Sequence, residues 1–442
     1  VGSEMCIRDR GNIWRFPYLA AKYGGGIFLL VYIILALTFG YTMIVAESAL
    51  GRMTRKSPVG AFRSFAKGKK VGWLSFGGWI NAIIPVLIVP YYSVIGGWVV
   101  KYLFEYIRGN GSKLAEDGYF SGFISNGGAT ELCFVIFCMV TLVIIYAGVQ
   151  NGIERVSKIM MPILIVLSVI IAIYSVTRPG AIEGVKYFLV PNVKNFSWMT
   201  VVAAMGQMFY SLSIAMGILV TFGSYMRKDT SIEDSTRNVE IFDTAIAMMA
   251  GLMIIPAVFA FSGGDPDTLQ AGPSLMFITI PKVFANMGFG TAVGILFFVL
   301  VLFAAVTSSI ALTESAVSTF EDELGWGRKK ATVLTGVIMI TLGTLSCLGY
   351  GPLDFVKIIG MQFLDFFDFL TNSVMMPIAA LMTSLLVSRV IGVDKIEEEI
   401  RHGESTFRRK KIFVVMIKYL CPIFALIILA SSVANAFGWI AM

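Results

Sequence analysis

The stretch Gly11-Asn12-Ile13-Trp14-Arg15-Phe16-Pro17-Tyr18 interrupts a series of membrane-length apolar segments. It places an asparagine, an arginine and the helix breakers glycine and proline next to sequence of bilayer depth. A charged side chain at the centre of a spanning helix costs about 2.5–3.5 kcal/mol on insertion scales. Chains keep such residues mainly where they line a polar pathway. The stretch therefore indicates a transporter.

The composition of the 442-residue chain also indicates a membrane protein. Hydrophobic residues make up 57% and charged residues 14%, and the mean hydropathy is +0.79, unlike a soluble domain. The single histidine, His402, lies in a charged segment, which argues against zinc chemistry and histidine-based catalysis and hence against an enzyme. The five cysteines are scattered without a CxxC pair, so we interpret them as packing residues.

Eleven segments satisfy the need for roughly 20 apolar residues per spanning helix, the first of them truncated. The predicted spans are 11–22, 26–50, 78–105, 130–149, 156–177, 199–225, 240–262, 287–320, 330–349, 361–391 and 412–440. Residues 11–442 are thus predicted to form one integral membrane domain. Prolines are predicted to break several spans, which is tolerated only where neighbouring helices or a cavity satisfy the freed backbone groups. These prolines are Pro85, Pro90, Pro162, Pro256 and Pro377.

Lysine and arginine gather in alternate connections, which orients the predicted spans. Basic residues are frequent at 52–70, between the second and third spans, and four are consecutive at 408–411. Under the positive-inside rule these loops are cytoplasmic, so the chain is predicted to end outside a bacterial inner membrane. The net charge of +7 then reflects topology and not a nucleic-acid surface. Contact of the basic loops with anionic lipid is an alternative.

Residues 1–10 do not fit this pattern, because they place charges close together where the cytoplasmic half of the first span is expected. They also lack the apolar core of a signal peptide. We expect them to be a foreign or mistranslated segment.

Several motifs resemble those of the neurotransmitter:sodium symporter family. The opening stretch and Gly24-Gly25-Gly26 match its first-span signature, and similar motifs follow in order at 47–52, 206–213, 307–309 and 321–323. The resemblance implies an all-α membrane fold of two inverted five-helix repeats, spans 1–5 and 6–10, with spans 1 and 6 unwound at mid-membrane. The eleven-span count is similar to that of the shorter bacterial members.

The sequence Ser211-Leu212-Ser213-Ile214-Ala215-Met216-Gly217 has the small, polar and glycine content that an unwound helix needs. In such a break, carbonyl groups can hold a cation while amide N–H groups face a carboxylate. The same residue types are typical of a face through which helices pack closely. The family resemblance favours the break.

The resemblance implies two co-transported sodium ions, the first held by Asn12, Ser211 and Asp243 next to the substrate carboxylate. Many family members have a neutral residue at the position of Asp243 and bind chloride nearby. The fixed carboxylate therefore predicts that chloride is not required. Alternatively, Asp243 lies near the end of its span and is merely solvated.

The resemblance assigns the second sodium to the Ala304 carbonyl, Thr307 and Ser308, together with carbonyls from the missing half of the first span. Threonine and serine hydroxyls also bond back to carbonyls of their own helix, which is the ordinary interpretation of such a run.

For the substrate, Tyr92 matches the family tyrosine that holds an amino acid carboxylate, and Gly11 would lend its backbone amide. The flexible Met216 would favour hydrophobic or aromatic side chains, although a lone methionine is usually a packing residue. The substrate residues implied by the resemblance are Gly11, Ile88, Tyr92, Tyr210, Ser211, Ser213, Met216, Ser308 and Leu312.

Three further residues match gates of the family. Arg15 and Asp368 would close the extracellular gate as a pair, and Asp322 matches an acid of the cytoplasmic gate. Alternatively, Arg15 extends its charge to the outer surface. Glu47 resembles a buried acid that supports the unwound backbone.

The resulting hypothesis is sodium-coupled uptake of an amino acid by alternating access. The chain has no GxxxxGK[ST] motif for ATP, so it must use an ion gradient. Two alternatives remain: a differently coupled carrier of the same fold, and a sensor that binds substrate without transport. A homodimer is compatible with the family resemblance.

Overall fold

The computed structural model describes residues 12–13, 15–66, 72–263 and 275–437, and these are almost entirely helical. Within this described part no β-strand forms, and the extended pairing is limited to two isolated bridges. Residues 1–10, predicted to be foreign, and Gly11 lie outside the described residues.

Nine helical stretches in the described ranges are long and apolar enough to cross a membrane. They are Gly26–Thr54 (α3, Gly26–Leu35, and α4, Tyr41–Thr54), Gly72–Ile107 (with α6, Ser75–Ile107), Gly127–Tyr146 (α9), Gly152–Val176 (with α10, Arg155–Val176), Ile232–Ser262 (α14), Gly290–Leu324 (α16), Arg328–Leu348 (α17), Phe363–Ile391 (with α18, Phe363–Asp368, and α19, Met376–Leu385) and Lys410–Asn435 (with α21, Lys410–Val415, and α22, Cys421–Ala436). Two predicted spans are shorter: the first is α2 (Arg15–Lys22), and the sixth is divided into α12 (Trp198–Ser211) and α13 (Ile218–Tyr225). Each predicted span therefore contains a helix.

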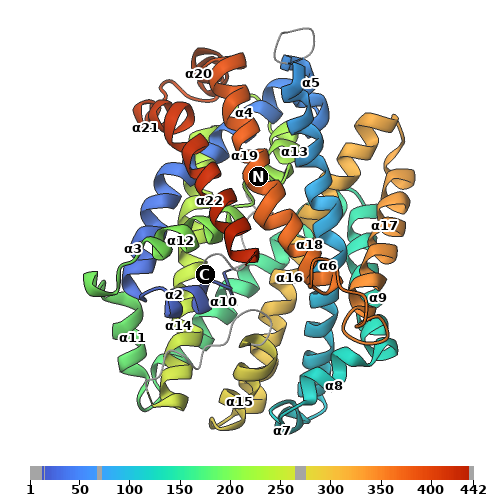
Figure 1. Cartoon of the computed structure of the whole chain (residues 1–442), viewed down its shortest axis with the longest axis vertical. Helices are drawn as coiled ribbons and strands as arrows, with labels where there is room; N and C mark the ends of the chain where they lie inside the picture. The colour runs from blue at the N-terminus through green and yellow to red at the C-terminus, as the bar shows by residue number, and fades with distance from the viewer. Residues whose placement is uncertain (1–11, 14, 67–71, 264–274, 438–442) are drawn as a thin grey trace.

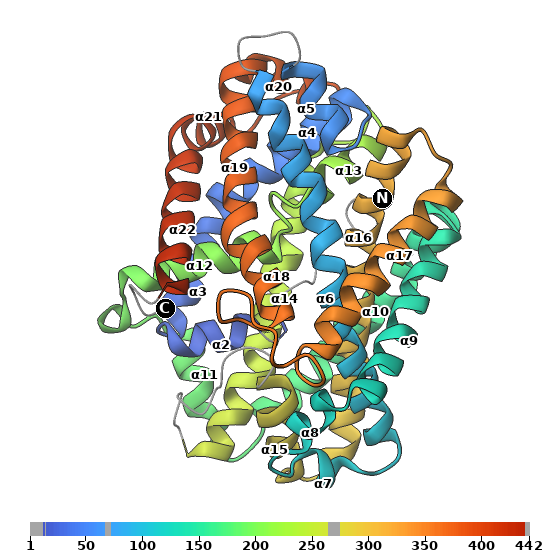
Figure 2. The same cartoon turned by 45° about the vertical axis from the view of Figure 1, so that its right-hand side comes forward.

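The helices run between two ends of the molecule. In Figures 1 and 2, α5 (Pro58–Ala66), α20 (Val393–Arg401) and α21 lie at one end, whereas α7 (Gly111–Leu114), α8 (Tyr119–Ser125) and α15 (Ile280–Ala285) lie at the other. We call the first the basic end, because the arginine- and lysine-rich connections at 52–66 and 408–411 belong to it.

Helix packing places the divided sixth span inside the bundle. The long helix α6 packs against α16, α9 and α17, while α4 packs against α13. Helix α14 packs against α10, α2 and α11 (Ala181–Leu189). The backbone between α12 and α13 is therefore enclosed by other helices, where any free polar group must be satisfied within the protein or by a ligand.

The prediction that prolines break the spans is wrong, because all five prolines lie within continuous helical stretches. Helix α6 continues through Pro85 and Pro90, α10 through Pro162 and α14 through Pro256. A proline removes one hydrogen bond from a helix, and surrounding helices support the turn where that bond is lost. Pro377 lies in the first turn of α19, after the π-helical segment η7 (Phe369–Met375).

A buried ion pair ties α20 to the end of α4. The Arg52 guanidinium is completely buried, and its Nε donates to Glu399 Oε1 at 2.6 Å. Its other nitrogens donate to the backbone carbonyls of Thr230, at 2.6 Å, and Glu399. All of the positive charge of Arg52 is thus used within the protein.

The segment before α21 is attached to the start of α14 in the same way. Arg409 pairs with the buried Glu240 at 3.0 Å. Glu233 accepts hydrogen bonds from the Tyr41 hydroxyl and from the backbone N–H groups of Arg408 and Arg409. We call this set of contacts, with the Arg52–Glu399 pair, the basic-end clasp. Most charges of the 408–411 cluster pair with acids of this chain: Arg408 with Asp234, Arg409 with Glu240 and Lys410 with Glu397.

We predict that Arg52→Ala lowers the thermal unfolding midpoint of the detergent-solubilised protein. Removing one partner of a buried ion pair typically costs about 3–5 kcal/mol, because the other charge stays buried without compensation. Fluorescence-detected unfolding measures the effect. Arg227→Ala is the matched control, because the Arg227–Asp229 pair is largely exposed; equal midpoints for the two variants would contradict the prediction.

Candidate functional site

Residues 212–217 separate α12 from α13 and do not continue the helix. Ser213, Ala215 and Gly217 have positive φ angles of 55°, 59° and 71°, a backbone conformation that residues other than glycine rarely adopt. The prediction that span six unwinds is confirmed. The Ala215 N–H donates to Glu47 Oε1 at 2.9 Å, so the buried Glu47 supports the unwound backbone in this structure.

A buried polar cluster lies beside this segment. Asp243 Oδ1 accepts from Asn12 Nδ2 at 2.8 Å and from the Ser211 hydroxyl, and Asp243 Oδ2 accepts from the Tyr32 hydroxyl at 2.5 Å. Asn12 Oδ1 accepts from Ser211 Oγ at 3.0 Å and from Gln207 Nε2 at 3.2 Å. The residues predicted to hold the first sodium are therefore in direct contact.

The electrostatics of this cluster are unbalanced. Asp243 is only 1% exposed, so it is not a solvated carboxylate at the end of a span. Among the described residues no lysine or arginine pairs with it, and its hydrogen-bond donors are neutral. A buried carboxylate without a counter-charge is costly. Carboxylate, amide and hydroxyl oxygens in one place suit a hard cation.

Two members of the cluster were missed by the sequence reasoning. Tyr32 contributes a hydroxyl group from the apolar helix α3, and Gln207 contributes an amide group from α12. Gln207 lies in the 206–213 motif that supported the family resemblance, so its polarity at bilayer depth was a usable signal. Tyr32 is less conspicuous, because a tyrosine is also a common packing residue of spanning helices.

The residues predicted for the second sodium lie on α16. The Thr307 hydroxyl donates to the carbonyls of Phe303 and Ala304, both at 3.0 Å. This is the helix back-bonding that threonine makes without a ligand, although the lone pairs of its oxygen stay available. Ser308 is buried beside it. Their role as sodium ligands stays a prediction.

The predicted substrate residues are all buried where they are described. Ile88 and Tyr92 are one turn apart on α6, and Ser308 and Leu312 are one turn apart on α16, which packs against α6. The other four occupy the end of α12 and the unwound segment: Tyr210, Ser211, Ser213 and Met216. Helices α6, α12 and α16 therefore supply the two kinds of surface that an amphipathic ligand needs, apolar side chains and hydroxyl groups.

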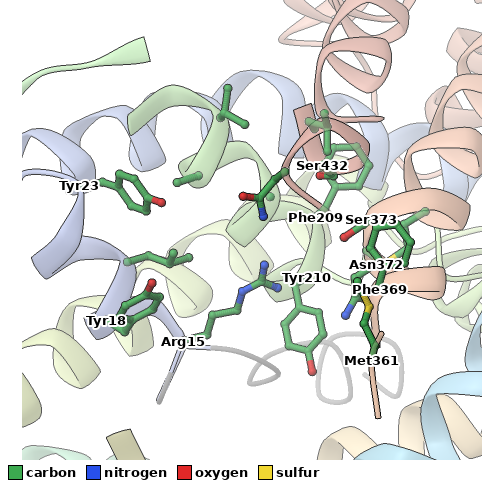
Figure 3. A pocket seen from close by; sticks show the side chains of 17 residues that line it. Arg15, Tyr18, Tyr23, Phe209, Tyr210, Met361, Phe369, Asn372, Ser373 and Ser432 are labelled. Carbon is green, nitrogen blue, oxygen red and sulfur yellow. The ribbon is translucent and has the colours of Figure 1, made fainter. Parts of the chain in front are cut away.

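A cavity of about 310 Å³ opens above Tyr210 and is lined by residues of α2, α12, η7, α19 and α22. Arg15 extends into it, with its guanidinium carbon 5.3 Å from the centre of the Tyr210 ring; Figure 3 shows both side chains, and Asn372 beyond Tyr210. Asp368 accepts instead from Tyr91, at 3.1 Å, and from Asn372. In the described structure no ion pair joins Arg15 to Asp368.

The predicted cytoplasmic gate acid, Asp322, lies near the end of α16. Its carboxylate accepts from the backbone N–H of Ser57 at 2.5 Å. The neighbouring Glu323 pairs with Arg63 of α5 at 2.7 Å. These contacts close α5 against α16 at the basic end.

Known proteins resemble this chain over nearly its whole length. A model of the Sodium:neurotransmitter symporter family matches residues 4–112 and 119–438. The uncharacterized sodium-dependent transporter YhdH of Bacillus subtilis is 35% identical over 398 residues, which cover 89% of this chain and 87% of that protein. The human sodium- and chloride-dependent GABA transporter 2 is 26% identical over 455 residues, covering 88% of this chain and 71% of that one.

Among solved structures, the crystal structure of MhsT in complex with L-phenylalanine is similar throughout. The TM-score is 0.86 at 35% identity, and the match covers 98% of this chain and 97% of that chain.

We predict that Gly217→Ala destabilises the protein. A Cβ atom at this position would lie 2.7 Å from the Asn81 carbonyl oxygen and 2.8 Å from Pro58, and φ is +71°. The left-handed conformation alone costs an L-residue roughly 1–2 kcal/mol. The thermal unfolding midpoint should fall, whereas Gly206→Ala, whose Cβ would meet nothing within 4 Å, should leave it unchanged or raise it. A Gly217→Ala protein as stable as the parent would show that the segment is less tightly enclosed than described.

Proposed function

The chain belongs to the Sodium:neurotransmitter symporter family, and we propose that it takes up an amino acid with a hydrophobic or aromatic side chain. Uptake would be coupled to sodium and proceed by alternating access. The observation that carries the proposal is the buried cluster of Asp243, Asn12 and Ser211 beside the unwound segment at 212–217. It combines a fixed negative charge with a break in a spanning helix. This arrangement supports a cation site next to backbone groups that can hold a substrate.

Sodium completes the charge balance of this cluster. A single positive ion between Asp243, Asn12 and Ser211 would compensate the carboxylate. A second ion on the Ala304 carbonyl, Thr307 and Ser308 would attach α16 to the first span. Sodium entering down its gradient supplies the free energy, and binding of both ions prepares the site for substrate.

The substrate class follows from the walls of the predicted pocket. Tyr92 offers a hydroxyl to the substrate carboxylate, and Ile88, Met216 and Leu312 supply buried apolar surface. The similar MhsT binds L-phenylalanine in its crystal structure, which supports a hydrophobic or aromatic amino acid for this chain. In the transport cycle, Arg15 and Asp368 close the outer side, and the contacts of Asp322 with α5 open on the cytoplasmic side, which we assign to the basic end.

Chloride is not required for transport in this proposal. The Asp243 carboxylate occupies the buried position at which an anion would offset the charge of the first sodium. Transport by this chain should therefore not depend on chloride, unlike the transport described in the name of the human relative.

We predict that purified protein in proteoliposomes accumulates a radiolabelled hydrophobic or aromatic amino acid only when an inward sodium gradient is imposed. Gradients of potassium or of protons are the controls. Accumulation driven by protons would identify a differently coupled carrier. Saturable binding that never leads to accumulation would identify a sensor.

We predict that Asp243→Asn raises the half-saturating sodium concentration by at least about tenfold. An ion pair at 4 Å is worth about 4 kcal/mol at an effective dielectric constant of 20, and 1.4 kcal/mol is a factor of ten. Chloride should partly restore uptake by this variant, whereas replacement of chloride by gluconate should not affect the parent. Asp229→Asn, at an exposed carboxylate, is the control. A parent protein that stops transporting in gluconate would refute chloride independence.

A further inference from the structure

The outer-gate acid Asp368 is held by two groups other than Arg15. Tyr91 donates its hydroxyl hydrogen to Asp368 Oδ1 at 3.1 Å, and Asn372 Nδ2 donates to the same oxygen at 2.5 Å. Asn372 Nδ2 also lies 3.4 Å from the Tyr91 oxygen. The three side chains form a closed triangle that directs the carboxylate toward α6 instead of toward Arg15.

Asn372 has an unused acceptor at the cavity. Its Oδ1 is buried, and no hydrogen-bond donor among the described residues reaches it. The side chain nevertheless lines the same cavity as Arg15. A guanidinium group offers five N–H donors, and in this structure Arg15 directs its charge at the face of the Tyr210 ring. Within the described part of the chain, a donor group and an acceptor atom without hydrogen-bond partners therefore belong to two side chains that line one cavity.

The backbone at Asn372 is also unusual. Asn372 lies in the π-helical segment η7, between Asp368 and Pro377. Pro377 has no N–H to bond the carbonyl four residues earlier, which favours a wider turn at this point. Such π-helical turns are frequent at functional sites. Here the turn presents Asp368, Thr371 and Asn372 to Tyr91 together.

We propose that Asn372 is a positioning residue of the outer gate. While the cavity is open, its amide N–H holds Asp368 against Tyr91 and away from Arg15. When the cavity closes, Asp368 leaves this position, and the Asn372 Oδ1 atom accepts a hydrogen bond from the approaching Arg15. Tyr91 directly precedes Tyr92, so a substrate that draws on Tyr92 also disturbs the hold on Asp368. This inference rests on the proposed function, in which Arg15 and Asp368 close the outer side.

Accessibility of the cavity tests the proposal without requiring transport. Ser432 lines the cavity, and Ser432→Cys provides a thiol whose reaction rate with a membrane-impermeant maleimide reports the open state. Protein without this cysteine gives the background. The rate is compared in sodium, without substrate, for the Ser432→Cys parent and for variants at position 372.

Asn372→Asp should lower the labelling rate by about tenfold, because it replaces a charge-assisted hydrogen bond to Asp368 by repulsion and offers Arg15 a second carboxylate. Asn372→Ala removes both the bond to Asp368 and the acceptor offered to Arg15 and adds no repulsion, so a smaller decrease of about two- to fivefold is expected, with the lost bond to the Asp368 carboxylate the larger of the two effects. Ser373→Ala, at the neighbouring cavity residue, should label like the parent.

The proposal is overturned if Asn372→Asp or Asn372→Ala labels as fast as the parent or faster. If Asn372→Asp does not fold, Asn372→Ala decides. A second readout is the background Asp368→Asn, in which Asn372→Ala should lose most of its effect because the charge-assisted bond to position 368 is already gone; an undiminished effect would also overturn the proposal. Failure of sodium-driven uptake by the parent would refute the proposed function and leave the labelling result separate from it.

Discussion

A carboxylate buried in the membrane domain without a basic partner in the described part of the chain is the constraint on which the rest of the site depends. Asp243, in the seventh span, is surrounded by neutral donors from three other spans: Asn12 from the first, Tyr32 from the second and Ser211 from the sixth. Neutral hydrogen bonds orient a negative charge but do not cancel it. The four spans therefore meet around a carboxylate whose charge no described basic residue offsets, which is the basis on which we propose a cation here.

The unwound segment adds the second requirement of the site. Between α12 and α13 the chain leaves the helix at residues that are small or flexible, and two non-glycine residues there, Ser213 and Ala215, have positive φ angles. Glu47 compensates part of this strain by accepting from the Ala215 N–H. The unwound segment 212–217 thus lies beside the buried Asp243 carboxylate. A second buried acid, Glu47 of another span, holds the backbone of that segment in place.

Hydropathy and motifs predicted most of the fold, because spans and their order follow from the length of apolar segments. The division of span six was predictable from the family resemblance, whereas the composition of 211–217 alone also suited a face through which helices pack. The predicted helix breaks at prolines were wrong. Pro85, Pro90, Pro162 and Pro256 look like helix breakers in the sequence, but the helices continue through them in the structure. The partners of Asp368 were not predictable either. That Tyr91 and Asn372, rather than Arg15, hold this acid depends on the rotation of α6 against η7, which no local pattern encodes.

The basic-end clasp has a practical consequence for engineering. The connection between α20 and α21 looks like a polar surface loop of the kind usually chosen for an epitope, a protease site or an inserted fluorescent protein. Here its arginines and the acids of α14 hold one another, and Arg52 secures the preceding helix to α4. An insertion near residue 408 would therefore act on two spans that contribute to the proposed ion site. Labels belong at the opposite end of the molecule, near Gly122 of α8, where an added Cβ atom would meet nothing within 4 Å.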